Sequence, residues 1–249
     1  GGQFTFGEVP VGPFTLPSTD PVSGFPVSAQ ATVVADQTQV VPLQYIGKGA
    51  LSVTVTRAGG DPLSGMTVQV SAAGLNTQTR ASGADGVAGP FTDLPLGTAL
   101  TVTASHPGLP TVLARSTTVT LSAASATTTL ALPAFGSVSG VVRRPNGQSA
   151  GANVDVNLTN TGQSVPGAVV ETTGSFFYST RTNANGEFTF GPVPLNRLFR
   201  IRAYHPLTVI QFTRPYLDTA DLAVTTDGQA LTADTRYPAL ARLAITVQN

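Results

Sequence analysis

The sequence of 249 residues contains no cysteine and no tryptophan, and methionine occurs once. Without cysteine the chain has neither disulfides nor thiolate metal sites. Charged residues make up only 10% and the formal net charge is zero, and the longest basic run is Arg143-Arg144. Nucleic-acid binding requires a basic stripe that neutralises phosphates, so the composition excludes it. No apolar run reaches the roughly 18 residues of a membrane-spanning helix, so no membrane span is expected.

Glycine and proline are abundant instead, with 26 and 19 residues. Both destabilise helices, and their even spacing leaves little room for one. The intervening segments are rich in threonine and valine, which favour pleated strands. The composition therefore predicts an all-β protein. Low charge, many hydroxyl residues and repeats together favour an extracellular or cell-surface location.

One phrase recurs three times along the chain. It spans Phe4–Gly12, returns in shorter form at Phe91–Gly97, and returns again at Phe188–Asn196. The last two copies are each followed by an alternating strand pattern that ends in His-Pro, at His106 and His205. Such self-similarity is typical of tandem repeats.

A second phrase, an alternating strand pattern, also recurs. Its copies are Gly49–Val55, Gly136–Val142 and Ala241–Asn249, and they begin 87 and 105 residues apart. Both intervals match the size of one β-sandwich domain. In the two complete repeats, this opening strand is followed by a turn and a second strand.

The two phrases together predict the domain organisation. Residues 47–135 form one complete β-sandwich repeat, and residues 136–238 form another that carries a longer hairpin insertion at 157–182. Residues 1–46 form the later half of a repeat, beginning at its Gly-x-Phe-x-Phe strand. Residues 239–249 are the opening strand of a further repeat. A lone strand cannot bury its apolar face, so we expect either a longer chain or neighbouring subunits that complete each other's domains.

The third repeat carries a family pattern. An opening strand at Gly136–Val142 leads to Gly151–Val156, then to the Thr-x-x-x-Gly-x-Phe-x-Phe run Thr182–Phe190 and the turn Val193–Asn196. This resembles the carboxypeptidase regulatory-like domain, a transthyretin-like β-sandwich related to the Cna-B stalk repeats of bacterial surface proteins. The second repeat departs from the pattern at Asp85–Phe91. The resemblance implies tandem Ig-like or transthyretin-like sandwiches, incomplete at both ends, that serve as spacers, stalks, adhesion modules or non-catalytic appendages.

No catalytic constellation is evident. The two histidines occupy equivalent repeat positions, and a scaffold feature repeats whereas a catalytic site is usually unique. The sequence contains no nucleophile elbow and no phosphate-cradling loop. We therefore expect no enzyme activity and no cofactor.

Several minor sites remain as hypotheses. Calcium ligands are offered by the turn 182–187 and by four aspartates in one late stretch, although solvated turns explain both. The resemblance implies Lys–Asn crosslinks, but the only lysine, Lys48, lies in an expected linker, so such a crosslink inside either complete repeat is not expected. Asn157 fits a glycosylation acceptor or a chance match. Aromatic residues of the insertion, Phe176–Tyr178, either form a contact surface or pack within their own hairpin.

The sequence favours a structural segment of an extracellular fibre, stalk or surface filament, whose partners are copies of itself or neighbouring repeats. A more specific form of this hypothesis is a filament in which neighbouring subunits share strands head to tail. The alternatives are a carbohydrate-binding or adhesion module, for which a glycan partner has no support in the sequence, and a non-catalytic appendage of a secreted peptidase. The residues expected to carry assembly are Leu243, Ile245 and Val247 of the last strand and Phe4 and Phe6 of the first repeat.

Overall fold

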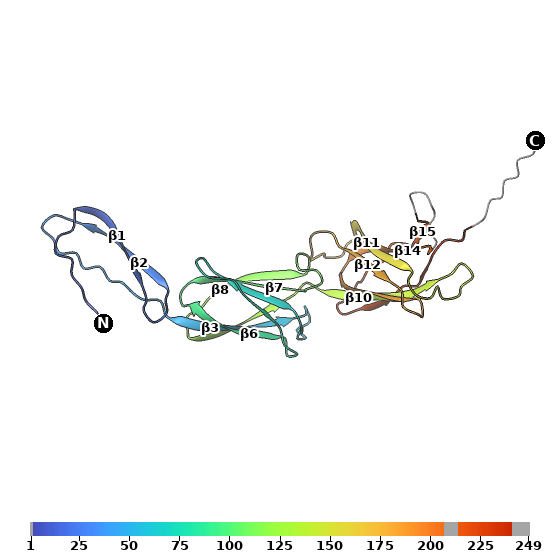
Figure 1. Cartoon of the computed structure of the whole chain (residues 1–249), viewed down its shortest axis with the longest axis horizontal. Helices are drawn as coiled ribbons and strands as arrows, with labels where there is room; N and C mark the ends of the chain where they lie inside the picture. The colour runs from blue at the N-terminus through green and yellow to red at the C-terminus, as the bar shows by residue number, and fades with distance from the viewer. Residues whose placement is uncertain (1, 207–213, 241–249) are drawn as a thin grey trace, which may run out of the picture.

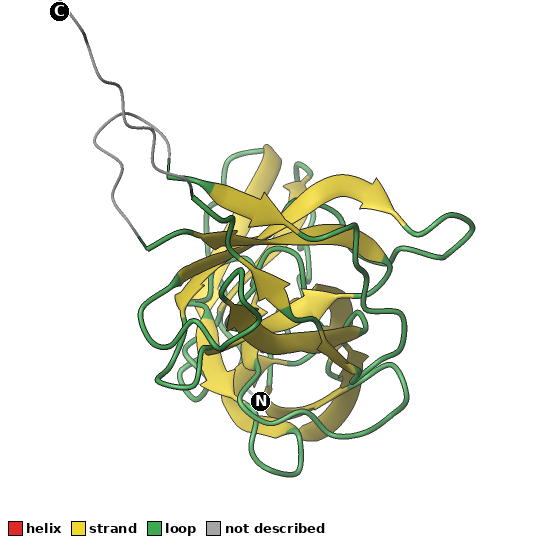
Figure 2. Cartoon of the chain, turned by 90° about the vertical axis from the view of Figure 1, so that its right-hand side faces the viewer, coloured by secondary structure: helices red, strands yellow, loops and turns green. Residues whose placement is uncertain are grey.

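The chain is all-β, as its composition predicts. The computed structural model describes residues 2–206 and 214–240, and within these ranges the backbone forms strands and turns but no α-helix. No helix of this part is long and apolar enough to cross a membrane. The strands form an elongated row of three bodies: an N-terminal sheet, a central sandwich and a C-terminal sandwich (Figure 1). Figure 2, which looks along this row, shows the strands and their connecting loops.

The N-terminal sheet has two antiparallel strands, β1 (Gly12–Thr19) and β2 (Pro26–Val33). They pair in register from Gly12 opposite Val33 to Thr19 opposite Pro26. Buried Asp20 closes the connection, since its carboxylate accepts hydrogen bonds from the Val22 amide and the Ser23 hydroxyl.

The sequence-based expectation of a strand at Phe4–Phe6 is wrong for the isolated chain. Residues 2–11 contain no strand, and the first one begins at Gly12. A strand requires a hydrogen-bonding neighbour, and the strand that pairs with this phrase in both sandwiches has no counterpart in the described part of residues 1–46.

The central sandwich packs a three-stranded sheet, in the order β6-β3-β9, against a four-stranded sheet, in the order β5-β4-β7-β8. The opening strand β3 pairs antiparallel with β6 and parallel with β9. Its side chains alternate strictly, with Leu51, Val53 and Val55 fully buried. The seven strands are β3 (Lys48–Thr56), β4 (Thr67–Ser71), β5 (Gln78–Ala81), β6 (Val87–Pro95), β7 (Ala99–Ser105), β8 (Ala114–Thr120) and β9 (Ser125–Ala131).

The C-terminal sandwich repeats this topology. Its opening strand β10 pairs antiparallel with β13 and parallel with the short strands β16 and β17, and the facing sheet has the order β12-β11-β14-β15. The eight strands are β10 (Phe135–Arg143), β11 (Asp155–Ser164), β12 (Phe177–Arg181), β13 (Glu187–Pro194), β14 (Arg197–Tyr204), β15 (Tyr216–Asp218), β16 (Ala230–Thr232) and β17 (Thr235–Arg236).

Each sandwich has its own apolar core. One core includes Leu51, Phe91 and Leu100, and the other includes Phe188, Phe199 and Ile201. Apolar alternation on facing strands explains both cores. Lys48, which the sequence places in a linker, already belongs to β3, and the C-terminal sandwich begins with Phe135, the first residue of β10.

Candidate functional site: the junction between the sandwiches

Phe135 belongs to both sandwiches. Its backbone belongs to the C-terminal sandwich, because Phe135 is the first residue of β10 and lies opposite Pro194 of β13. Its side chain, 7% exposed, is part of the core of the central sandwich. One residue thus anchors the second sandwich in the hydrophobic interior of the first.

An ion pair lies on one side of this anchor. The Arg57 guanidinium, directly after β3, donates to the Asp227 carboxylate over 3.0 Å and to the Phe135 carbonyl over 3.2 Å. The same carboxylate accepts the Phe135 amide over 3.2 Å, and the Gly228 amide donates to the Phe135 carbonyl over 2.9 Å. Both polar groups of the Phe135 backbone are therefore satisfied by the loop 225–229 and Arg57. The guanidinium carbon also lies 4.5 Å from the centroid of the Phe135 ring, within cation–π range.

The turn after β7 fills the middle of the junction. The ring of His106 meets Phe135 edge-on, with centroids 5.1 Å apart, and its Nδ1 accepts the Gly108 amide over 3.0 Å. Burial and the nearby Arg57 charge lower the pKa of His106, which favours the neutral ring that this acceptor role requires. A Cβ at Gly108 would lie 2.8 Å from Pro192 of the C-terminal sandwich, so only glycine allows this approach. Leu109 packs against both cores.

The insertion in the C-terminal sandwich forms the other side of the junction. Glu171 pairs with Arg115 of β8 over 3.0 Å, and the position of Gly174 lies beside Val112. The sequence left two interpretations of its aromatic residues open, an exposed contact surface or packing within the hairpin, and each holds for one residue. Phe176 is buried in the core, whereas Phe177 is 58% exposed.

Four aspartates of the late stretch are all paired with arginines, over 2.6–3.0 Å. These pairs neutralise the negative charge that a calcium ion would require. In the turn 182–187 the Asn183 side chain accepts the amides of Asn185 and Glu187, which is an ordinary turn role. In the described ranges no group of three or more potential ligands is arranged to hold a metal ion. The four pairs are Asp218–Arg202, Asp221–Arg200, Asp227–Arg57 and Asp234–Arg143.

Lys48 and Asn157 have local roles in the structure. The Lys48 ammonium pairs with Asp93 over 2.9 Å at the end of the central sandwich that faces the N-terminal sheet, and it lies 6.0 Å from the centroid of the Phe25 ring. The ion pair lies within the central sandwich, and only the contact with Phe25 reaches the N-terminal sheet, at the outer limit of cation–π range. The Asn157 amide donates to the Tyr204 hydroxyl over 3.2 Å.

The residues predicted to carry assembly fall into two groups. Phe4 and Phe6 are 63% and 59% exposed and contact each other edge-on, with centroids 5.6 Å apart. Leu243, Ile245 and Val247 lie outside the described residues.

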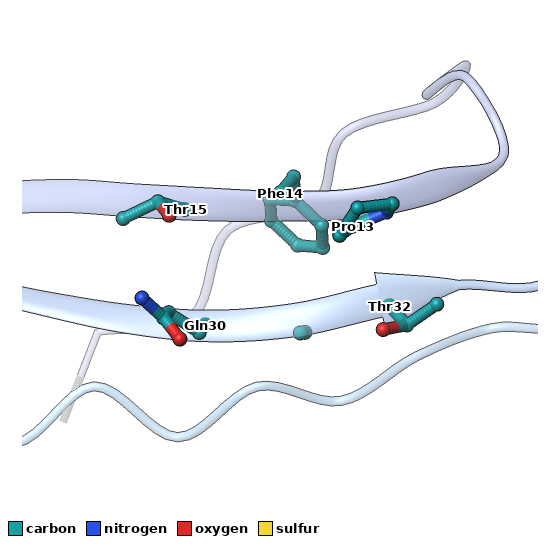
Figure 3. A pocket seen from close by; sticks show the side chains of 6 residues that line it. Pro13, Phe14, Thr15, Gln30 and Thr32 are labelled. Carbon is teal, nitrogen blue, oxygen red and sulfur yellow. The ribbon is translucent and has the colours of Figure 1, made fainter.

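A shallow open hollow of about 410 Å³ lies over the N-terminal sheet, between Phe14 and Thr15 on β1 and Gln30 and Thr32 on β2 (Figure 3). No charged side chain lines it. It therefore has the character of an uncovered sheet surface, with no group suited to catalysis.

The junction itself is not predicted by the sequence. Arg57, Arg115, Glu171 and Asp227 each lie in or beside a strand or loop without any motif, and nothing in the local pattern connects residues 170 positions apart. One signal is present. The loop 225–229 is longer than the equivalent loop 122–124 of the central sandwich, and the extra length contains Asp227.

The fold and the junction define a protein with two β-sandwiches in a row, joined through the shared residue Phe135. No protein-family model and no curated protein matches the sequence.

Among solved structures, those to which the chain is similar include the TIE protein of Bacillus anthracis and two pilins. It is 13% identical to the TIE protein of Bacillus anthracis, with a TM-score of 0.31, and the match covers 91% of this chain but only 43% of that protein. It is 12% identical to a streptococcal ancillary pilin (TM-score 0.35, covering 92% and 76%) and 9% identical to the shaft pilin SpaA from Lactobacillus rhamnosus GG (TM-score 0.39, covering 80% and 100%). Values this low describe a loose likeness in fold and transfer no property to this chain.

Proposed function

We propose that this chain is a structural repeat segment of an extracellular fibre, stalk or surface filament. The observation that carries the proposal is the shared residue Phe135, whose backbone lies in one sandwich and whose side chain lies in the core of the other. Spacer and stalk proteins need successive domains held at a fixed angle, and a residue shared between two sandwiches would fix the angle between them.

Bending at the junction would have a direct energetic cost. Withdrawing a phenylalanine side chain from a core costs about 1.5–3 kcal/mol in apolar transfer alone. It would also separate Arg57 from Asp227, whose side chains are only 27% and 23% exposed, and leave a partly buried charge without its partner. The exposed pair Arg115–Glu171 adds little energy but restrains rotation on the opposite side.

Two further features belong to the same proposal. The sandwiches belong, in this proposal, to the carboxypeptidase regulatory-like and Cna-B-like group, which the motifs of the third repeat resemble and which fits a surface location. Copies of the chain assemble head to tail by sharing strands, with Leu243, Ile245 and Val247 as the donated residues. We expect no enzymatic activity in such a segment.

Small-angle X-ray scattering on the full chain tests the rigid junction. At concentrations where it is monomeric, the wild type should give a narrow distribution of interatomic distances, with a maximum distance that fits three bodies in a row. Arg57→Ala should broaden the distribution and shorten the mean end-to-end distance, because the two sandwiches then sample several angles. Arg236→Ala, which changes an arginine at the surface of β17, is the control and should leave the curve unchanged. Indistinguishable curves for wild type and Arg57→Ala would refute a rigid joint.

A further inference from the structure

The opening strand and the last strand of the central sandwich lie side by side. β3 and β9 pair in parallel over seven consecutive residues, from Ala50 opposite Ser125 to Thr56 opposite Ala131. Backbone hydrogen bonds of 2.9 Å close the ladder at both of its ends. An uninterrupted ladder therefore joins the strand by which the chain enters this sandwich to the strand by which it leaves.

Parallel pairing places the entry and the exit of the chain at opposite ends of the sandwich. β3 begins at Lys48, at the end that faces the N-terminal sheet, whereas β9 ends at Ala131, opposite the last residue of β3. After a short connection the chain continues into β10 of the C-terminal sandwich, and β3 and β10 both run along the row of bodies (Figure 1). Tension along the row therefore pulls β3 and β9 in opposite directions along their own axes.

The direction of a load decides how many hydrogen bonds must break together. In a parallel pair the bonds are evenly spaced along the strands. Tension along the strands strains all of them at once, because the strands can move only by sliding past each other. Tension across the strands at one end opens the bonds one after another. Since forced unfolding is governed by the unfolding rate, a ladder loaded in shear resists force beyond what its equilibrium stability indicates.

Side-chain packing adds to the resistance of this ladder. Leu51, Val53 and Val55 of β3 are fully buried, and Leu130 of β9 packs in the same core. Sliding β3 by one residue would turn its buried side chains toward the solvent, because successive residues of a strand point to opposite faces. The first step of shear must therefore disrupt the ladder and the core together.

The C-terminal sandwich has the same topology with a divided ladder. Its opening strand β10 pairs in parallel with two short strands, over three residues of β16 and two of β17. Between these strands, at Ala233 and Asp234, the regular pairing is interrupted. Fewer hydrogen bonds share the load, so this sandwich should yield at a lower force than the central one.

The side chain of Asp234 bridges the interruption. Its Oδ1 accepts the Val141 amide over 2.9 Å, on the side of β10 that faces β16 and β17. Its Oδ2 accepts two hydrogen bonds from the Arg143 guanidinium, over 3.1 and 2.8 Å. Hydrogen bonds to an ionised carboxylate are stronger than those between neutral groups. Asp234 thus connects two residues of β10 to the segment between β16 and β17, along the direction of the load.

We infer that the chain bears tension along its row of bodies and that each sandwich acts as a shear clamp, here the parallel pairing of its opening strand with its last described strands. The central sandwich is the stronger clamp, and the C-terminal sandwich, held in part by Asp234, yields first. This inference rests on the proposed function and names the load that a fibre or stalk segment carries. Two clamps of unequal strength let the chain lengthen in a defined order under increasing tension.

Pulling single molecules from different attachment points tests the central clamp. The chain has no cysteine, so pairs of introduced cysteines can carry the handles. Lys48→Cys with Ala131→Cys loads β3 and β9 in shear, whereas Lys48→Cys with Ala124→Cys pulls both strands from the same end, and all three positions are exposed. At equal loading rate the unfolding force should be several-fold higher in the first geometry. Equal forces in the two geometries would overturn the inference.

A variant of Asp234 tests the order of unfolding in the full chain, pulled from its two ends. The gain in contour length identifies each sandwich, because more residues lie between the first and last described strands of the C-terminal one. The C-terminal step should come first, and Asp234→Ala should lower its force while the central step stays unchanged. A central step that precedes the C-terminal one would contradict the inference.

Asp218→Ala is the matched control for Asp234→Ala. It also removes an arginine pair, with Arg202, but on β15, which does not pair with β10. It should leave the unfolding force unchanged even where urea denaturation shows a loss of stability, and an equal loss of force in both variants would refute the role of Asp234. The rigid junction is measured by scattering without load, so the clamp and the junction can each fail without the other.

Discussion

Gly140 shows how closely the opening strand of the C-terminal sandwich is packed. A Cβ at this position would clash with the Ala233 carbonyl oxygen and lie 2.9 Å from the ring of Phe188. Gly140→Ala should therefore lower the free energy of unfolding by about 1–3 kcal/mol, because backbone and ring must move apart. Urea denaturation followed by circular dichroism measures the change. Gly59→Ala, at a turn with open space around it, should change the stability by less than about 0.5 kcal/mol, and an equal loss at both sites would contradict the packing argument.

His106 gives the junction a dependence on pH. Its pKa is lowered in the folded chain by burial and by Arg57, from an ordinary value of about 6.5. Below that value the unfolded chain binds the proton more readily, so stability is full above about pH 6.5 and falls as the pH decreases toward the folded pKa. The urea midpoint of the wild type should therefore drop between about pH 8 and pH 5.

The control is His106→Gln, whose amide oxygen can still accept the Gly108 amide. It should lose less stability over the same pH interval. The pKa of His205 is lowered by burial and Arg214 and contributes in the same direction, so the difference between wild type and variant isolates His106. Identical pH profiles would show that His106 is not linked to folding.

At the scale of single elements, the alternation of apolar residues predicts most of the strands. Leu51, Val53 and Val55 are buried as their spacing requires. The phrase Phe4–Phe6 has the same spacing and yet lies outside any strand, because strand formation depends on a neighbour as well as on the pattern. Periodicity identifies the face that is to be buried and leaves open which segment covers it.

The hydroxyl of Tyr178 connects the two sheets of the C-terminal sandwich. It donates to the Pro192 carbonyl of β13 from its place on β12, and burial raises its pKa. Tyr178→Phe should cost about 0.5–1.5 kcal/mol, because the carbonyl loses its partner while the ring stays packed. Chemical denaturation gives the value. Tyr216→Phe is the matched control, since that ring is 44% exposed on β15, and a larger loss there than at residue 178 would refute the inter-sheet role.

At the scale of the whole molecule, the sequence predicts sandwich repeats in a row but not how they are held. The junction combines Arg57 with Asp227, which are 170 residues apart, and no local pattern marks such a pair. Only the fold brings the end of β3 to the loop 225–229. The sequence contains one signal, the extra length of that loop. The structure explains it, because the longer loop carries Asp227 to the Phe135 amide and to Arg57.

A shared junction makes the two sandwiches stabilise each other, and this coupling can be measured. If contacts across the junction contribute to both, then Asp227→Ala, a change in a loop of the C-terminal sandwich, should weaken the central sandwich as well. The hydrogen-exchange protection of the β3 amides at Val53 and Val55 should fall by about tenfold, equivalent to about 1.4 kcal/mol, since a charged hydrogen bond contributes about 1.5–3 kcal/mol.

Asp221→Ala is the matched control, because Asp221 is also paired with an arginine, but wholly within the C-terminal sandwich. It should reduce the protection of amides in β14 and leave those of β3 unchanged. If Asp227→Ala leaves β3 equally unchanged, the sandwiches are independent and the junction holds them in place without stabilising them. A parallel loss in both sandwiches is the expected result, since separating them removes the same contacts from each.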